Sequence, residues 1–161
     1  MKAGIGDTEL FLSVVRPIAA AMHSGKEADH KLRFYQELSK GEQAAFMYWV
    51  FHSHAACKEQ FYTWIPYMRH ADQGYWEQLW HGMKLIGCAG VLQLMERCDQ
   101  LYEELERDKT GWAAYQPADL AETGLRQRVE VLYLEFEELK PRAMEMIGRY
   151  IKDRPEAFTE R

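Results

Sequence analysis

The histidines are the residues of this chain whose type and spacing come closest to metal chemistry. Glu77 and His81 are four residues apart, so on a helix both side chains lie on one face. No HExxH motif and no pair of ExxH motifs occurs, so the sequence predicts no metal site and no cofactor. His54, Glu77 and His81 are kept as metal candidates for an alternative function, a metal-dependent helical-bundle enzyme. Such an enzyme would draw its ligands from His52, His54, His70, Glu77 and His81.

Nucleophilic catalysis has less support in the sequence. Cys57 has Lys58 beside it and His54 three residues before it, an arrangement that can activate a thiol. A free cysteine on a helix is more often a small buried apolar residue. GxSxG, SxxK and glycine-rich phosphate-loop motifs do not occur. The sequence therefore leans against an enzyme and predicts no catalytic residue.

Aromatic residues are concentrated between residues 40 and 80, where eleven of the twenty-one lie. A single helical stripe cannot bury all of them, which favours a central helix surrounded by others. The other interpretation is a small-ligand groove, because Tyr and Trp are enriched at binding sites. That groove would be lined by Tyr48, Trp49, Tyr62, Trp64 and Trp76.

Acidic residues gather on two predicted helices of the C-terminal half. Like charges along one helix face repel, so the usual explanation of such a cluster is a solvated face. The alternative explanation is a surface that attracts a basic partner. We predict that a partner would bind Glu96, Asp99, Glu103, Glu104, Glu106, Glu135, Glu137 and Glu138.

The elements that must position these residues are predicted to be helical throughout. Five prolines occur among 161 residues, and no stretch alternates apolar and polar side chains as a half-buried strand does. We predict an all-α, single-domain bundle of about six to seven helices, some short or kinked. The domain is expected to span residues 1–161, with a frayed tail from about residue 156.

Prolines are expected to set several helix boundaries. Pro17 predicts that the first helix kinks or ends near Arg16; residues 18–22 can continue it, and Ser24 and Gly25 then end it. Pro66 argues against a regular helix through Trp64 and Ile65. Pro141 suits the first position of a final helix, which stops by residue 155.

Other boundaries follow from capping residues and glycine. Ser39 and Glu42 are spaced as a capping box and mark the clearest helix start in the chain. Two glycines within residues 87–90 favour a break between helices. A helix is also predicted from about residue 26 to residue 38, and Asp119 is the predicted cap of the helix that follows the loop at 108–117.

Composition limits the cell compartment and the kinds of partner that we expect. The formal net charge is −5, and no basic patch of the kind that binds nucleic acid is evident, so we expect no direct nucleic-acid binding. Three cysteines without CxxC spacing indicate a reducing compartment. With no signal-peptide pattern and no long apolar run, we predict a soluble cytoplasmic protein that does not enter a membrane.

Several segments occur in a familiar order. Residues 59–62 read Glu-Gln-Phe-Tyr and residues 85–89 read Leu-Ile-Gly-Cys-Ala, and the similarity continues at 132–139, 147–151 and 154–158. Over roughly residues 35–160 the chain resembles a small helical family, of largely unknown function, that includes a bacterial DNA-mimic protein. The family typically has Asn-Gly-Gly before its Gln-Phe step, whereas this chain has Ala-Ala-Cys-Lys at 55–58. The resemblance implies an all-α fold and, for at least one member, binding of a DNA-binding protein through an acidic surface.

Together these observations predict a non-enzymatic protein-interaction module that binds a basic or DNA-binding protein through its acidic helix faces. The alternatives are the metal-dependent enzyme and a small-ligand binder that uses the Trp/Tyr cluster. The sequence does not indicate an oligomeric state.

Overall fold

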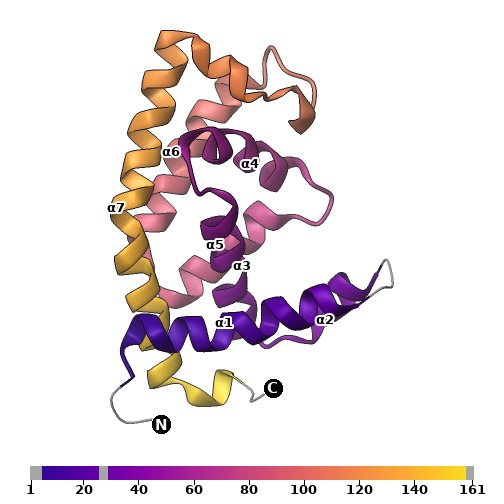
Figure 1. Cartoon of the computed structure of the whole chain (residues 1–161), viewed down its shortest axis with the longest axis vertical. Coiled ribbons are helices and arrows are strands. Elements are labelled where there is room, and N and C mark those ends of the chain that lie inside the picture. The colour runs from indigo at the N-terminus through magenta and orange to yellow at the C-terminus, as the bar shows by residue number, and fades with distance from the viewer. Residues whose placement is uncertain (1–4, 26–28, 159–161) are drawn as a thin grey trace.

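A computed structural model of the chain describes residues 5–25 and 29–158, and its regular structure is all helical (Figure 1). The described residues form a bundle of seven α-helices, as predicted. The helices are α1 (Asp7–Ser24), α2 (His30–Glu37), α3 (Lys40–His54), α4 (Lys58–His70), α5 (Tyr75–Ile86), α6 (Ala89–Leu105) and α7 (Thr123–Asp153). Three short 3-10 helices accompany them, η1 (Trp112–Ala114), η2 (Pro117–Ala121) and η3 (Pro155–Ala157). None of these helices combines the length and apolar character needed to cross a membrane.

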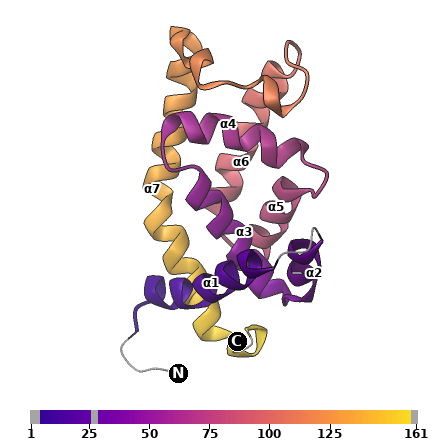
Figure 2. The same cartoon turned by 45° about the vertical axis from the view of Figure 1, so that its right-hand side comes forward.

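The 31-residue helix α7 forms one side of the bundle. Helix α6 packs along its N-terminal half and α1 crosses its C-terminal half. Figures 1 and 2 place both ends of the chain at one end of the molecule and the connection between α6 and α7 at the other. Helix α3 lies in the middle and contacts α1, α4, α5 and α7.

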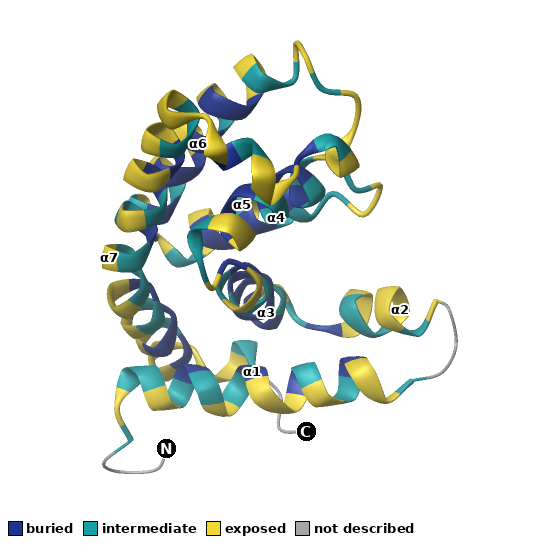
Figure 3. Ribbon diagram, turned by 45° about the horizontal axis from the view of Figure 1, so that its top comes forward, coloured by how far each residue is buried: buried dark blue, intermediate teal, exposed yellow. Residues whose placement is uncertain are grey.

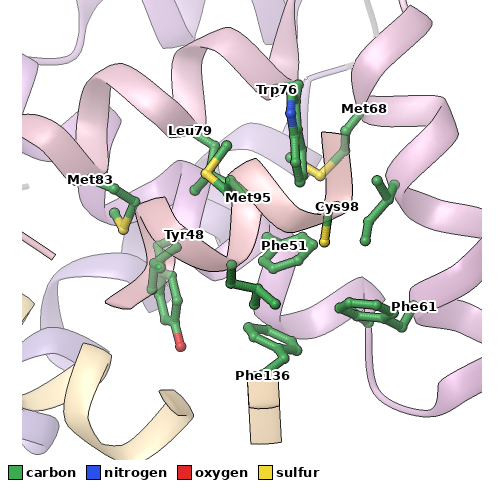
Figure 4. Packing of buried hydrophobic residues seen from close by; sticks show 14 of the residues in the cluster. Tyr48, Phe51, Phe61, Met68, Trp76, Leu79, Met83, Met95, Cys98 and Phe136 are labelled. Atoms are coloured by element: carbon green, nitrogen blue, oxygen red, sulfur yellow. The ribbon is translucent and has the colours of Figure 1, made fainter. Parts of the chain in front are cut away.

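Burial explains most of the aromatic concentration. Helix α3 is buried on most of its surface, whereas α2 has no buried residue (Figure 3). Phe51 of α3 is 0% exposed, and its ring centroid lies 4.6 Å from that of Phe136 on α7. Phe61 and Trp76 pack against Phe51 from α4 and α5, at 6.2 and 6.0 Å (Figure 4). Aromatic side chains bury large areas, so this cluster stabilises the bundle, as the central-helix interpretation expects.

Two predicted boundaries are confirmed. The Ser39 hydroxyl accepts a hydrogen bond from the Glu42 N–H at 3.1 Å, and a Glu42 carboxylate oxygen accepts one from the Ser39 N–H at 2.9 Å. This is the predicted capping box at the start of α3. Gly87 ends α5 at φ +86°, a conformation that residues with a Cβ rarely adopt, and α6 begins two residues later.

The proline predictions were wrong at two positions. Pro66 lies inside α4 and Pro141 lies inside α7, so neither begins or ends a helix. Pro17 lies inside α1, which continues to Ser24 and has Gly25 as its C-cap, the end that the sequence predicts for a helix continuing past the proline. Packing explains the continuity, because buried side chains flank each proline on the same helix. An interior proline costs about 3 kcal/mol, and burying two or three large apolar side chains offsets that cost.

Capping also differs from prediction at the start of α7. Asp119 does not cap it, because it lies within η2, where its side chain accepts the N–H of Gln116. Helix α7 starts four residues later, and the Glu122 carboxylate accepts the N–H groups of Gly124 and Leu125 instead. The helix predicted from about residue 26 is observed from His30; residues 26–28 lie outside the described chain.

The C-terminal segment packs back on the bundle. Ser39 donates a side-chain hydrogen bond to the carbonyl of Ala157, and the Phe158 ring meets Tyr150 at 6.2 Å. The predicted fraying from about residue 156 stays a prediction. Residues 159–161 lie outside the described part.

Candidate functional site

Two of the predicted partner-binding carboxylates hold α4 against α6. Arg69 of α4, whose side chain is 11% exposed, donates from Nε to Asp99 at 3.0 Å and forms an ion pair with Glu106. Asp99 also accepts the indole N–H of Trp76 at 2.9 Å. Glu106 lies 2.7 Å from Nε2 of His70. Asp99 and Glu106 are thus engaged within the fold, where they neutralise a mostly buried guanidinium.

Two more of these carboxylates join α6 to α7. Glu104 of α6 accepts from Arg128 of α7 at 2.8 Å. Glu135 of α7 accepts from Nε of Arg97 of α6 at 3.0 Å. Exposed pairs of this kind contribute little stability each, but they cancel charge that a partner would otherwise meet.

The remaining predicted carboxylates divide into one paired and three free side chains. Glu137 forms an ion pair with Lys140, three residues further along α7. Glu96, Glu103 and Glu138 are exposed, and no ion pair links any of them to another described residue. Five of the eight predicted carboxylates are therefore paired inside the described part of the chain, and three of the eight are left for a partner.

The metal candidates do not gather. His54 lies at the end of α3 and stacks on Trp64 at 3.9 Å, and burial lowers the pKa of its imidazole. Glu77 and His81 are exposed on α5. No three His, Cys, Asp or Glu side chains come together as a metal site within the described residues.

The predicted Trp/Tyr groove is not formed by the five residues as a set. Tyr48 and Tyr62 are 0% exposed and Trp76 is 8% exposed, so all three belong to the core. Trp49 is half-buried against Phe11, with ring centroids 6.2 Å apart. Trp64 alone among the five lines one of the two pockets described below.

This pocket lies between α4 and the loop that joins α6 to α7. It has a volume of about 370 Å³, within the usual range of about 300–1,000 Å³ for small-molecule sites. Most of its lining is aromatic. The lining residues are Thr63, Trp64, Tyr67, Trp112, Ala113, Tyr115 and Gln116.

The three outer rings of the pocket pack on one another. Trp64 and Tyr67 are three residues apart on α4, so their side chains lie on one face, with ring centroids 4.8 Å apart. Trp112 meets Tyr67 edge-on at 5.0 Å. Gly111, at φ +81°, lets the chain turn just before Trp112, a conformation that suits glycine. The three rings form the aromatic wall of the pocket.

Tyr115 forms the inner wall and is 3% exposed. Its ring packs against Tyr62 and Tyr102, with centroids 5.8 Å from each. Lys109 lies over the same ring, with Nζ 5.2 Å from the centroid, and its ammonium group is 3.0 Å from Asp119. The three tyrosines and this ion pair fix the loop against the core.

Two polar atoms of the lining residues lack hydrogen-bond partners. Trp64 Nε1 and the Tyr115 hydroxyl are both buried and unpaired within the described structure. Buried polar groups are nearly always paired, and leaving one unpaired costs about 1–3 kcal/mol. Burial, with a further contribution from the charge of Glu106, raises the pKa of Tyr115, so its phenol stays protonated and can donate. The pocket therefore has aromatic walls, and two of its lining residues carry unpaired polar atoms that are closed off from solvent.

A second groove lies between α2, α3 and α5, with a volume of about 460 Å³. Leu32 and Leu85 are exposed along it, and Gln78 Oε1 is buried without a partner. Tyr35 and His81 carry the only rings among its described lining residues, so it offers less surface for stacking.

Comparison with known proteins found no related protein. No protein-family model, curated protein or solved structure matches the chain. The resemblance to the DNA-mimic family stays a prediction.

The pocket was only partly foreseen from sequence. Trp112 and Tyr115 lie in the predicted loop at 108–117, outside the aromatic-rich region. The available signal was a glycine followed by Trp and Tyr three residues apart, in a loop otherwise rich in polar and small residues. Loops often carry binding residues, so aromatic side chains there indicate more than they do on a helix.

Proposed function

We propose that this protein is a non-enzymatic binding module that takes a small planar ligand between α4 and the α6–α7 loop. The observation that carries the proposal is the pocket of about 370 Å³ lined by four aromatic residues. Rings of Trp and Tyr supply stacking area at a low cost in conformational entropy. A planar molecule would exchange water for contacts with Trp64, Tyr67 and Trp112.

The chemistry of the lining supports binding rather than turnover. No carboxylate, imidazole, thiol or amine is among the lining side chains. Thr63 and Gln116 are the polar residues besides the indoles and phenols, and neither is held by a general base. General acid–base catalysis needs a titratable group at the reacting atom, and the phenols of Tyr67 and Tyr115 are the only titratable side chains among the described lining residues.

The test is a screen of planar aromatic fragments by ligand-detected NMR on wild-type protein and two variants. Trp112→Ala removes a pocket wall, and Leu85→Ala is the matched control, because both side chains are 47% exposed. We expect fragments that bind wild type and Leu85→Ala but not Trp112→Ala. Equal binding to all three proteins, or no binding to any, would rule out the pocket as a ligand site.

A second candidate function is binding of a basic or DNA-binding protein through the free carboxylates. Glu96 and Glu103 are exposed two turns apart on one face of α6, without a salt bridge to any described residue. We would compare proteins released by salt from immobilised wild type with those released from a Glu96→Lys, Glu103→Lys, Glu138→Lys variant. A basic protein that binds wild type alone supports this function; the same proteins on both contradict it.

A further inference from the structure

We infer that the ligand of the aromatic pocket carries a hydrogen-bond acceptor, a carbonyl or carboxylate oxygen, on its planar body. This inference rests on the proposed function and adds the chemical class of the ligand. Its basis is the hydrogen-bonding capacity of two unpaired polar atoms that belong to lining residues, Trp64 Nε1 and the Tyr115 hydroxyl.

Both atoms call for an acceptor. An indole N–H can only donate, so Trp64 Nε1 is satisfied by an acceptor and by nothing else. The Tyr115 phenol can donate or accept, and burial raises its pKa, so it stays protonated and keeps a proton to donate. A ligand oxygen would remove the cost of one or both unpaired donors, a gain that an apolar ligand cannot make.

A cationic ligand fits the pocket less well, although aromatic walls often bind cations. Lys109 already places its ammonium group 5.2 Å from the Tyr115 ring centroid. The same ammonium donates to the carbonyl of Ala114 at 3.1 Å, next to the pocket lining. A second positive charge there would be repelled, and it would leave the two donors unpaired.

Access requires a small movement of the wall, because both polar atoms are closed off from solvent in this structure. The η1 turn is the part of the wall best able to move. It is three residues long, has no buried residue, and carries Trp112 at 47% exposure. Segments with so little burial open at low free-energy cost.

Three one-ring probes of similar size separate the possibilities. Benzamide carries a carbonyl acceptor, toluene carries none, and benzyltrimethylammonium carries a positive charge. Dissociation constants would be measured by NMR titration on the full chain. We expect benzamide to bind about tenfold more tightly than toluene, because pairing a buried donor is worth roughly that factor, and benzyltrimethylammonium to bind most weakly.

The variant Tyr115→Phe tests whether the hydroxyl causes the difference between benzamide and toluene, because it keeps the ring and removes the hydroxyl. Benzamide affinity should fall about fivefold in this variant while toluene affinity stays the same. Trp64→Phe, which keeps an aromatic ring, removes the other donor, and a larger loss for benzamide than for toluene is expected there too.

The outcomes distinguish the two claims. Equal binding of benzamide and toluene, or tightest binding of benzyltrimethylammonium, would overturn the acceptor inference and leave the pocket as a ligand site. A benzamide preference that neither variant reduces would also overturn it. Binding of none of the three probes would overturn both the inference and the proposed function.

Discussion

The Tyr62 hydroxyl donates a 2.7 Å hydrogen bond to Oδ2 of Asp119, across 57 positions of the sequence. The same carboxylate oxygen accepts the Gln116 N–H at 3.0 Å and lies 3.0 Å from the Lys109 ammonium group. One carboxylate therefore fastens the α6–α7 loop to α4, and with it the two pocket residues Trp112 and Tyr115.

Loss of the hydroxyl should affect stability differently at two tyrosines of the same ring cluster. Tyr62→Phe removes one of the three donors to Asp119 and should lower the free energy of unfolding by about 1–2 kcal/mol. Tyr115→Phe removes a buried hydroxyl that has no partner, so stability should stay unchanged or rise by up to about 1 kcal/mol. Urea denaturation measures both. A clear loss in Tyr115→Phe would mean that its hydroxyl is paired in solution.

Protonation of Asp119 in acid should lower the stability of the protein. Burial alone would raise its pKa, but hydrogen bonds from Gln116, Tyr62 and Lys109 outweigh burial and lower it. A carboxyl with a lowered folded-state pKa stabilises the fold above its unfolded pKa of about 3.9, and that contribution is lost as pH falls through the folded-state value.

Asp119→Asn should therefore be less stable than wild type at neutral pH, and the gap should close below about pH 4. Urea midpoints measured from pH 7 to pH 3 test this. Asp108→Asn is the control, because Asp108 is exposed and forms no salt bridge within the described chain. A gap that is constant with pH would show that the Asp119 charge is not what fastens the loop.

The acidic residues should fall into two groups by their effect on stability. Glu106→Gln weakens the ion pair with the mostly buried Arg69 and should cost about 1–2 kcal/mol. Glu103→Gln, at an exposed and unpaired position on the same helix, should stay within about 0.5 kcal/mol of wild type. Thermal and urea unfolding give both values, and equal effects would contradict the assignment of Glu106 to the fold.

The crossing of α1 and α7 should depend on Gly148. A Cβ there would clash with the backbone carbonyl of Asp7, so α1 would have to shift. Gly148→Ala should cost about 3 kcal/mol, as overpacking against backbone does. Gly6→Ala is the control at the same junction, since nothing lies within 4 Å of its added Cβ. Similar unfolding midpoints for the two variants would argue against this crossing.

Sequence predicted the parts of the fold that depend on local physics. Ser39 and Glu42 cap α3 through contacts within four residues, and Gly87 ends α5 through its own backbone conformation. The prolines were misjudged because their effect competes with distant packing. Pro141 stays inside α7 because Phe136 on one side of it and Ile147 on the other are both buried in the core.

The site was harder to predict for a related reason. The acidic pattern on α6 was visible in the sequence, but the bases that neutralise Asp99 and Glu104 come from α4 and α7. Trp64 was foreseen as a binding residue, whereas its pocket is completed by Trp112 and Tyr115 from a loop. Such pairings depend on tertiary contacts that no local spacing encodes.

The most direct measurement of the central claim, that the pocket beside α4 binds a planar ligand, uses the indole N–H signals of the five tryptophans. Benzamide would be titrated into ¹⁵N-labelled protein, with Trp64→Phe and Trp112→Ala assigning two of the signals. The account predicts saturable shifts of Trp64 and Trp112, while Trp49, Trp76 and Trp80 stay in place. Unchanged Trp64 and Trp112 signals, or a non-saturating drift of all five, would contradict it.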